Sequence, residues 1–137
     1  MGYEPTFFGC DGMDGILSVD GFDKSLAEGL MLLTPFSVDE ESSQDFVTAY
    51  RDAYGIDPLQ FAADAYDGVY AIKAAAEKAE ITPDMSTSDI CDALKTAMTE
   101  IQIDGLTGTE MHWTAEGEPQ KAPKAVEIKD GKYEMMQ

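Results

Sequence analysis

An acidic side chain that follows a predicted strand is the residue best placed to do chemistry in this sequence. Residues 6–10 form a short apolar, β-prone run that ends in Asp11-Gly12, which indicates a buried strand entering a turn. Open α/β sheets bind ligands just beyond the carboxyl ends of their strands. A partly desolvated carboxylate there can pair with a cationic group through charge-assisted hydrogen bonds. The alternative is that Asp11 only makes a turn, because Asp and Gly are favoured in tight turns for backbone reasons.

Catalytic and metal-binding patterns find no support in the sequence. His112 is the only histidine, and there is no Gly-x-Ser-x-Gly elbow, phosphate-binding glycine loop or metal-ligand cluster. Cys10 and Cys91 form no CxxC pair, so neither a zinc site nor a disulfide-rich scaffold is expected. We expect both thiols to be free and buried. The chain is therefore predicted not to be an enzyme and to need no cofactor and no metal.

The charge balance and the apolar runs exclude further classes of partner. The chain carries 27 acidic and 9 basic residues, a formal net charge of -18, so it would repel nucleic acid. Such acidity is typical of a solvated surface. The longest apolar runs, such as residues 30–33, are far short of the roughly 18 residues that cross a bilayer. The start of the sequence also lacks the basic and apolar regions of a secretory signal.

The elements that would position Asp11 alternate between strand and helix. Residues 29–35 read as a second buried strand stopped by proline, and a loop or short helix should connect it to the first strand. A helix should begin at Ser42 or Ser43 and end at Gly55, with Phe46, Val47, Tyr50 and Tyr54 at helical spacing.

Asp57-Pro58 should open the strongest helix, in which the apolar stripe predicted to pack comprises Phe61, Ala65, Val69, Ile72, Ala76 and Ala79. Thr87 or Ser88 should begin a third helix, whose predicted inner face comprises Ile90, Cys91, Leu94, Ala97 and Met98.

The last part of the sequence changes to a β pattern. Strands are expected at residues 108–114, 125–129 and 132–136, separated by a polar turn at 116–118 and a tight Asp130-Gly131 turn. Helices of this length mixed with strands predict an α/β fold with a hairpin-rich C-terminal tail.

An ordered set of short motifs carries a family resemblance. The set comprises Phe7-Phe8-Gly9-Cys10-Asp11-Gly12, Glu28-Gly29-Leu30, Thr34-Pro35-Phe36-Ser37, Phe46-Val47-Thr48-Ala49-Tyr50, Tyr54-Gly55, Pro58, Phe61-Ala62-Ala63, Ala65-Tyr66-Asp67-Gly68-Val69-Tyr70, Leu106-Thr107-Gly108 and Lys129-Asp130-Gly131-Lys132. In this order and spacing the motifs resemble the periplasmic branched-chain amino-acid-binding proteins of ABC transporters. The likeness spans nearly the whole chain.

The resemblance implies two three-layer α/β/α lobes that close on a ligand by a hinge motion. Residues 1–36 would end the second lobe, residues 37–125 would belong to the first lobe, and residues 126–137 would return toward the second. The N-terminal portion of such a protein would be missing, so that Met1 would be an internal methionine of a longer chain. The groups expected to hold a ligand's α-carboxylate would lie in that missing portion.

The resemblance also implies which residues bind the ligand. Asp11 would take the α-ammonium group, Gly12 and Met13 would line the same loop, and Phe61 and Tyr66 would lie near the ligand side chain. For Met13 and Phe61 a purely structural role in the apolar core stays open as the alternative, and for Tyr66 packing is the favoured interpretation. Asp64 and Asp67 are expected on a solvated face, with Asp67 able to tie its helix to a neighbouring loop, and they do not form a catalytic pair.

The function that follows is capture of an amino acid, with a branched-chain one as the default, for an ABC permease. The full-length protein would be periplasmic or extracellular, lipid-anchored in Gram-positive bacteria. The alternative is a ligand-sensing domain of the same fold in a signalling receptor, which predicts further sequence beyond residue 137. The short distance from the last strand to that residue favours the transporter.

Overall fold

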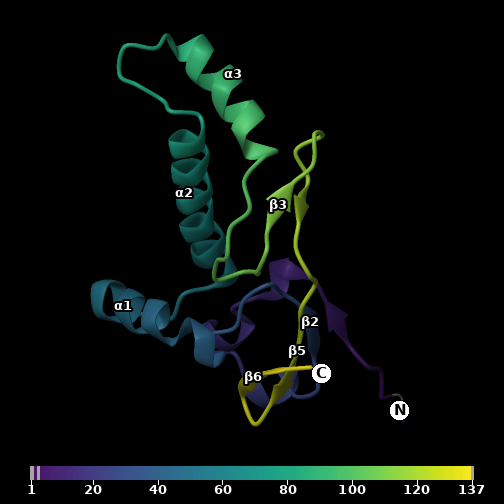
Figure 1. Cartoon of the computed structure of the whole chain (residues 1–137). Coiled ribbons are helices and arrows are strands. Elements are labelled where there is room, and N and C mark those ends of the chain that lie inside the picture. Colours follow the sequence, from purple (N-terminus) through teal and green to yellow (C-terminus); the bar gives the residue numbers. More distant parts are fainter. Residues whose placement is uncertain (1, 3, 137) are drawn as a thin grey trace. The chain divides into compact units, whose positions relative to one another are not determined.

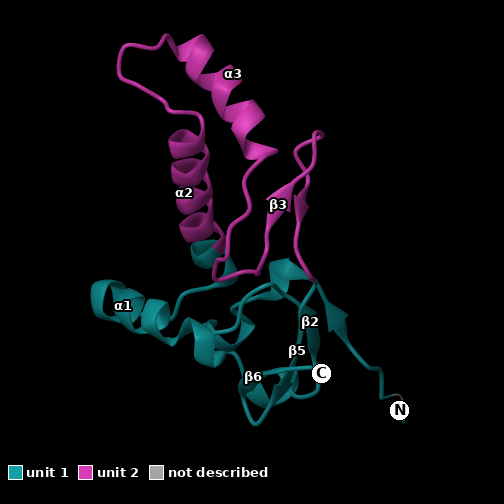
Figure 2. Cartoon of the chain, viewed as in Figure 1, with its two compact units in different colours: residues 1–63, 123–137 teal, residues 64–122 magenta. Residues whose placement is uncertain are grey.

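The computed structural model describes residue 2 and residues 4–136. The chain divides into two units, one made of residues 1–63 and 123–137 and the other of residues 64–122 (Figure 2). The first unit is discontinuous in sequence, because its sheet combines strands from both ends of the chain (Figure 1).

The first unit contains a mixed sheet in the order β1-β2-β5-β6. Strands β1 and β2 are parallel, and the other neighbouring pairs are antiparallel. Leu32 lies opposite Val126 at the centre of this sheet. The bounds of the strands are Phe8–Gly9, Met31–Leu33, Ala125–Lys129 and Lys132–Met135.

The core of this unit forms on one side of the central strands. Short 3₁₀ turns, rather than a long crossover helix, connect β1 to β2 and supply part of the cover. The buried apolar residues that pack together are Leu17, Ala27, Leu30, Leu32, Val126 and Ile128. Burial of six apolar side chains in one cluster supplies the main stabilising term of this unit.

Helix α1, Gln44–Tyr54, follows the chain's exit from β2. Gly55 ends the helix in the left-handed conformation, with φ 73° and its N–H donating to the Arg51 carbonyl at 2.8 Å. Glycine adopts this conformation without the strain that a Cβ brings. The predicted end of this helix is confirmed.

The second unit contains most of helix α2, together with α3 and a hairpin of β3 and β4. Ser86 caps α3 by accepting a hydrogen bond from the Asp89 N–H at 3.2 Å. Ala75, Ala97 and Ile101 form the buried cluster, with Leu94 and Trp113 packed against it. The bounds are Gln60–Lys78, Thr87–Met98, His112–Trp113 and Pro119–Gln120.

The predicted apolar stripe of α2 is wrong about which face packs. Phe61, Val69 and Ile72 are exposed, the last two by 65% and 59%, while the buried face carries Ala71 and Ala75. Alanines allow neighbouring backbone to approach closely, and Ala75 packs in the same cluster as residues of α3. The larger apolar side chains therefore point away from the packed side in the described part of the chain.

Two further expectations of burial are wrong. Residues 6–10 were expected as a buried strand, but only Phe8–Gly9 pair and Phe8 is 60% exposed. The reason is that β1 lies at the sheet edge and has β2 alone as its described neighbour. Cys10 and Cys91 are free as expected, but both are exposed. None of the helices in the described residues has the length and apolar character needed to span a membrane.

Candidate functional site

The turn after β1 presents the predicted ligand-binding carboxylate. Residues Asp11–Met13 form a single 3₁₀ turn, closed by hydrogen bonds from the Met13 N–H to the Cys10 carbonyl and from the Asp14 N–H to the Asp11 carbonyl, both 3.0 Å. Asp11 and Gly12 are exposed on this turn. The carboxylate of Asp11 makes no hydrogen bond or ion pair with the described residues, so it is available to an external cation.

Met13 packs over the strand that leads into the turn. A Cβ on Gly9 would overlap the Met13 sulfur and would lie 2.8 Å from Leu32 Cδ2, so the absence of a side chain at Gly9 leaves room for both neighbours. Met13 also lines an apolar pocket of about 450 Å³ together with Phe7, Phe8 and Phe22. Its side chain thus combines packing with access to a pocket.

The two predicted aromatic residues both lie on α2, but in different units. Phe61 is on the first turn of the helix and is 53% exposed. Tyr66 belongs to the second unit, where its hydroxyl lies 3.3 Å from the hydroxyl of Tyr70 and their ring centroids are 4.8 Å apart. Both side chains are therefore accessible in the described chain.

Helix α2 begins against the Asp11 turn. The backbone N–H of Gln60 donates to Asp14 Oδ2 at 2.6 Å, and its side-chain Nε2 donates to the Asp11 carbonyl at 2.9 Å. Asp14 therefore caps a helix that starts 46 residues later in the sequence. The structure brings together Asp11, Gly12 and Met13 with the helix start that carries Phe61.

Asp14 makes the stability of the folded chain depend on pH. Burial raises the pKa of its carboxyl above the usual 3.8, although the hydrogen bonds from Gln60 and Gly15 act in the opposite direction. A raised folded-state pKa means that the associated stability is present below the unfolded pKa and is lost as pH rises through the folded pKa. Ionisation of Asp14 is therefore less favourable in the folded chain than in the unfolded chain.

We predict that Asp14→Asn raises the stability of the folded chain more at pH 7 than at pH 3.5. The amide oxygen can still accept from Gln60, while the buried charge is gone. Asp20→Asn is the matched control, because Asp20 is exposed in the same unit and its substitution changes net charge equally. The thermal midpoint should rise by about 2 °C more for Asp14→Asn than for the control at pH 7. Equal shifts at both pH values would contradict this role of Asp14.

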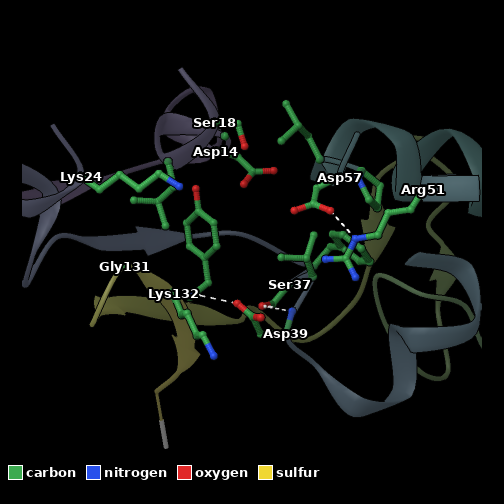
Figure 3. Close-up of a pocket in the computed structure, with 16 residues that line it drawn as sticks. Asp14, Ser18, Lys24, Ser37, Asp39, Arg51, Asp57, Gly131 and Lys132 are labelled. Atoms are coloured by element: carbon green, nitrogen blue, oxygen red, sulfur yellow. Dashed lines mark hydrogen bonds and ion pairs between the residues drawn. The ribbon is translucent and has the colours of Figure 1, made fainter. Parts of the chain in front are cut away.

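A polar cavity of about 170 Å³ lies in the same unit and was not predicted from the sequence (Figure 3). Arg51 and Asp57 lie side by side on its wall and form an ion pair. Tyr133 also lines the cavity, and burial raises the pKa of its hydroxyl. That hydroxyl lies near the backbone of Gly15 and Leu17 but forms no hydrogen bond of normal geometry among the described residues.

The sequence offers one signal for this cavity. Arg51 is the only arginine of the chain, and Asp57 follows six residues later, with the helix-ending glycine between them. That glycine reverses the chain and lets the two side chains meet. The cavity has basic and acidic groups on its walls, which suits small polar molecules or water. None of the five predicted ligand-binding residues lines it.

Asp67 has a structural role in the second unit. It is only 6% exposed, so the expectation of a solvated face is wrong for this residue, whereas Asp64 is exposed as expected. Its carboxylate accepts from the Leu106 N–H at 2.9 Å, the Thr107 N–H at 2.8 Å and the Thr107 hydroxyl at 2.7 Å. The predicted tie between the helix and a neighbouring loop is confirmed. The described residues contain no cluster of His, Cys, Asp and Glu that could hold a metal ion.

Comparison with known proteins places this geometry in a family. The chain matches the family described as periplasmic binding protein over residues 6–132. None of the curated proteins compared with the chain matches it. Several solved structures do share its fold.

Three of these structures indicate the range of relatives. The branched-chain amino acid transporter substrate binding protein LivJ from Streptococcus pneumoniae, in complex with isoleucine, is 26% identical with a TM-score of 0.73, covering 98% of this chain and 37% of that one. The leucine binding protein LivK from Thermotoga maritima is 21% identical with a TM-score of 0.67, covering 95% and 36%. An ABC transporter solute binding protein from R. palustris, in complex with benzoate, is 20% identical with a TM-score of 0.67, covering 90% and 32%.

The chain thus spans less than two fifths of each of these three structures. The fold of the described residues is α/β and corresponds to part of the larger fold, as the sequence predicts. Because the family match runs over residues 6–132, the chain belongs to the periplasmic binding protein family and represents a part of such a protein.

Proposed function

We propose that this chain is part of an extracytoplasmic solute-binding protein that captures an amino acid, by default a branched-chain one, for an ABC importer. Asp11 binds the α-ammonium group, while Gly12, Met13, Phe61 and Tyr66 contribute to the surroundings of the ligand. The protein acts outside the cytoplasmic membrane, in the periplasm or anchored to the cell exterior, and performs no chemistry on its ligand.

The free carboxylate of Asp11 is the observation that carries this proposal. An aspartate that only makes a turn commonly accepts a hydrogen bond from backbone two residues on, as Asp23 does from the Ser25 N–H at 3.1 Å. Asp11 makes no such bond among the described residues; its turn is closed by backbone groups alone. An exposed acid without an internal partner, at the exit of a strand, fits the recognition of a cationic group.

The similarity to an isoleucine complex supports the default choice of ligand. The exposed Phe61 and the apolar pocket that Met13 lines offer surface for an aliphatic side chain. We further propose that residues 1–36 and 126–137 belong to one lobe and residues 37–125 to the other. A ligand-sensing receptor domain of the same fold is the second candidate, because it would use the same carboxylate.

Calorimetric titration of the natural-length gene product that contains this chain tests the proposal. Isoleucine, leucine, valine, glutamate and benzoate form a suitable panel, since benzoate has a carboxylate but no ammonium group. We expect the three branched-chain amino acids to bind with micromolar or tighter affinity, about -8 kcal/mol or better. Binding of benzoate without binding of any amino acid would contradict the proposed ligand class.

A further inference from the structure

Gln60 joins three segments that lie far apart in the sequence. Its side chain is 1% exposed and is among the largest fully buried ones. The side-chain amide donates to the Asp11 carbonyl at 2.9 Å and accepts from the Thr34 hydroxyl at 3.1 Å. Its backbone N–H donates to Asp14 Oδ2 at 2.6 Å. One residue therefore connects the Asp11 turn, the exit of β2 and the first turn of α2.

The orientation of the Gln60 amide follows from its partners. The Asp11 carbonyl can only accept, so the amide nitrogen must face it and the amide oxygen must face Thr34. A flipped amide would place two acceptors against each other. The hydroxyl of Thr34 has a single proton, which can go to Gln60 or to the Phe36 carbonyl at 3.0 Å. The Asp11 carbonyl thus fixes the orientation of the Gln60 amide.

We propose that Gln60 is a positioning residue, which holds the Asp11 turn at a fixed distance from the helix start that bears Phe61. This inference rests on the proposed function, because it assumes that Asp11 contacts the ligand. Gln60 itself is buried and does not touch the ligand. Displacement of a binding group by about 1 Å is enough to weaken its interaction strongly. The affinity for ligand should therefore depend on Gln60.

Loss of the Gln60 amide should not unfold the chain. The Asp11 carbonyl also accepts from the Asp14 N–H at 3.0 Å, and the Thr34 hydroxyl can still donate to the Phe36 carbonyl. Neither partner is left buried without a hydrogen bond, which is the costly case. Methionine has a similar length and no strong polar atom. Gln60→Met thus removes the two side-chain hydrogen bonds, while the packing and the backbone bond from Gln60 to Asp14 remain.

The matched control is Gln44→Met. Gln44 is a part-buried glutamine of the same unit whose amide donates to the Val38 and Glu40 carbonyls, both at 2.9 Å, so its substitution also removes two hydrogen bonds. We expect Gln60→Met to weaken isoleucine binding by the natural-length gene product by about 10-fold or more, and Gln44→Met to change it by less than about twofold.

A double-mutant cycle with Asp11→Asn separates positioning from general stability. If Gln60 acts through Asp11, Gln60→Met should cost less than about twofold once Asp11 is already replaced. The inference is overturned if Asp11→Asn weakens binding while Gln60→Met leaves it unchanged, or if the two effects simply multiply.

Amide hydrogen exchange tests the role of Gln60 without ligand. It therefore applies even if isoleucine does not bind or if Asp11→Asn has no effect on binding. In the 137-residue chain, amide hydrogen exchange at Met13 and Asp14 reports the bonds that close the turn. We expect exchange there to become about 10-fold faster in Gln60→Met and to stay unchanged in Gln44→Met. Unchanged rates in Gln60→Met would show that the turn does not need Gln60 and would overturn the inference.

Discussion

Replacement of Asp11 by alanine is expected to weaken isoleucine binding by about 100-fold or more, because truncation of one partner of a charge-assisted pair commonly costs 2–5 kcal/mol. The change should leave folding intact, since the side chain is exposed and makes no bond with the described residues. The backbone hydrogen bonds that close the turn do not involve the removed atoms. Calorimetric titration of wild-type and variant gene products measures the difference.

Asp20→Ala is the matched control for this prediction. Asp20 is an exposed aspartate nearby in the sequence, and its loss changes the net charge of -18 by the same amount. A general electrostatic effect would weaken or strengthen binding similarly in both variants. If Asp11→Ala binds isoleucine as tightly as Asp20→Ala does, Asp11 only makes the turn.

Replacement of Asp67 by alanine is expected to destabilise the second unit by about 3–5 kcal/mol, since it leaves buried donors without their acceptor. The donors are the Leu106 and Thr107 backbone N–H groups and the Thr107 hydroxyl, and Thr107 is itself buried. Urea unfolding followed by circular dichroism measures the loss. Asp64→Ala is the control. The Asp64 side chain is exposed, so its ion pair with Lys121 should contribute less than about 1 kcal/mol.

Gly105 provides an independent check on the Asp67 contact. A Cβ at this position would lie 2.5 Å from the Asp67 carboxylate, so Gly105→Ala should also destabilise the chain. In the Asp67→Ala background the same substitution meets no carboxylate and should cost much less. Equal costs of Gly105→Ala in both backgrounds would contradict the close contact.

Local chemistry explains the elements that could be predicted from the sequence. Helix α3 begins at Thr87, one of the two predicted starts, although the capping side chain is that of Ser86, and α1 ends where Gly55 can adopt a positive φ. The Asp130-Gly131 turn joins β5 to β6 with positive φ at both residues, as a tight hairpin requires. Each of these signals depends on residues a few positions apart, which the sequence displays directly.

Burial and the anchoring of the site depend on distant residues and could not be predicted in the same way. Apolar spacing indicates that a helix has a packed face, but the alanine face of α2 is the packed one. The role of Asp14 is not visible in the sequence, because its partner, Gln60, is 46 residues away. The position of Asp11 after a strand was predicted, whereas the hydrogen bond from Gln60 to its carbonyl joins residues far apart in the sequence.

A comparison of leucine with its α-hydroxy analogue tests most directly the claim that Asp11 recognises an ammonium group. The two molecules share the carboxylate and the aliphatic side chain and differ only in the charged group. Wild-type gene product should prefer leucine by about 100-fold, and Asp11→Asn should lose most of that preference. Equal affinities in the wild-type protein, or a preference that survives Asp11→Asn, would contradict the assigned role of Asp11.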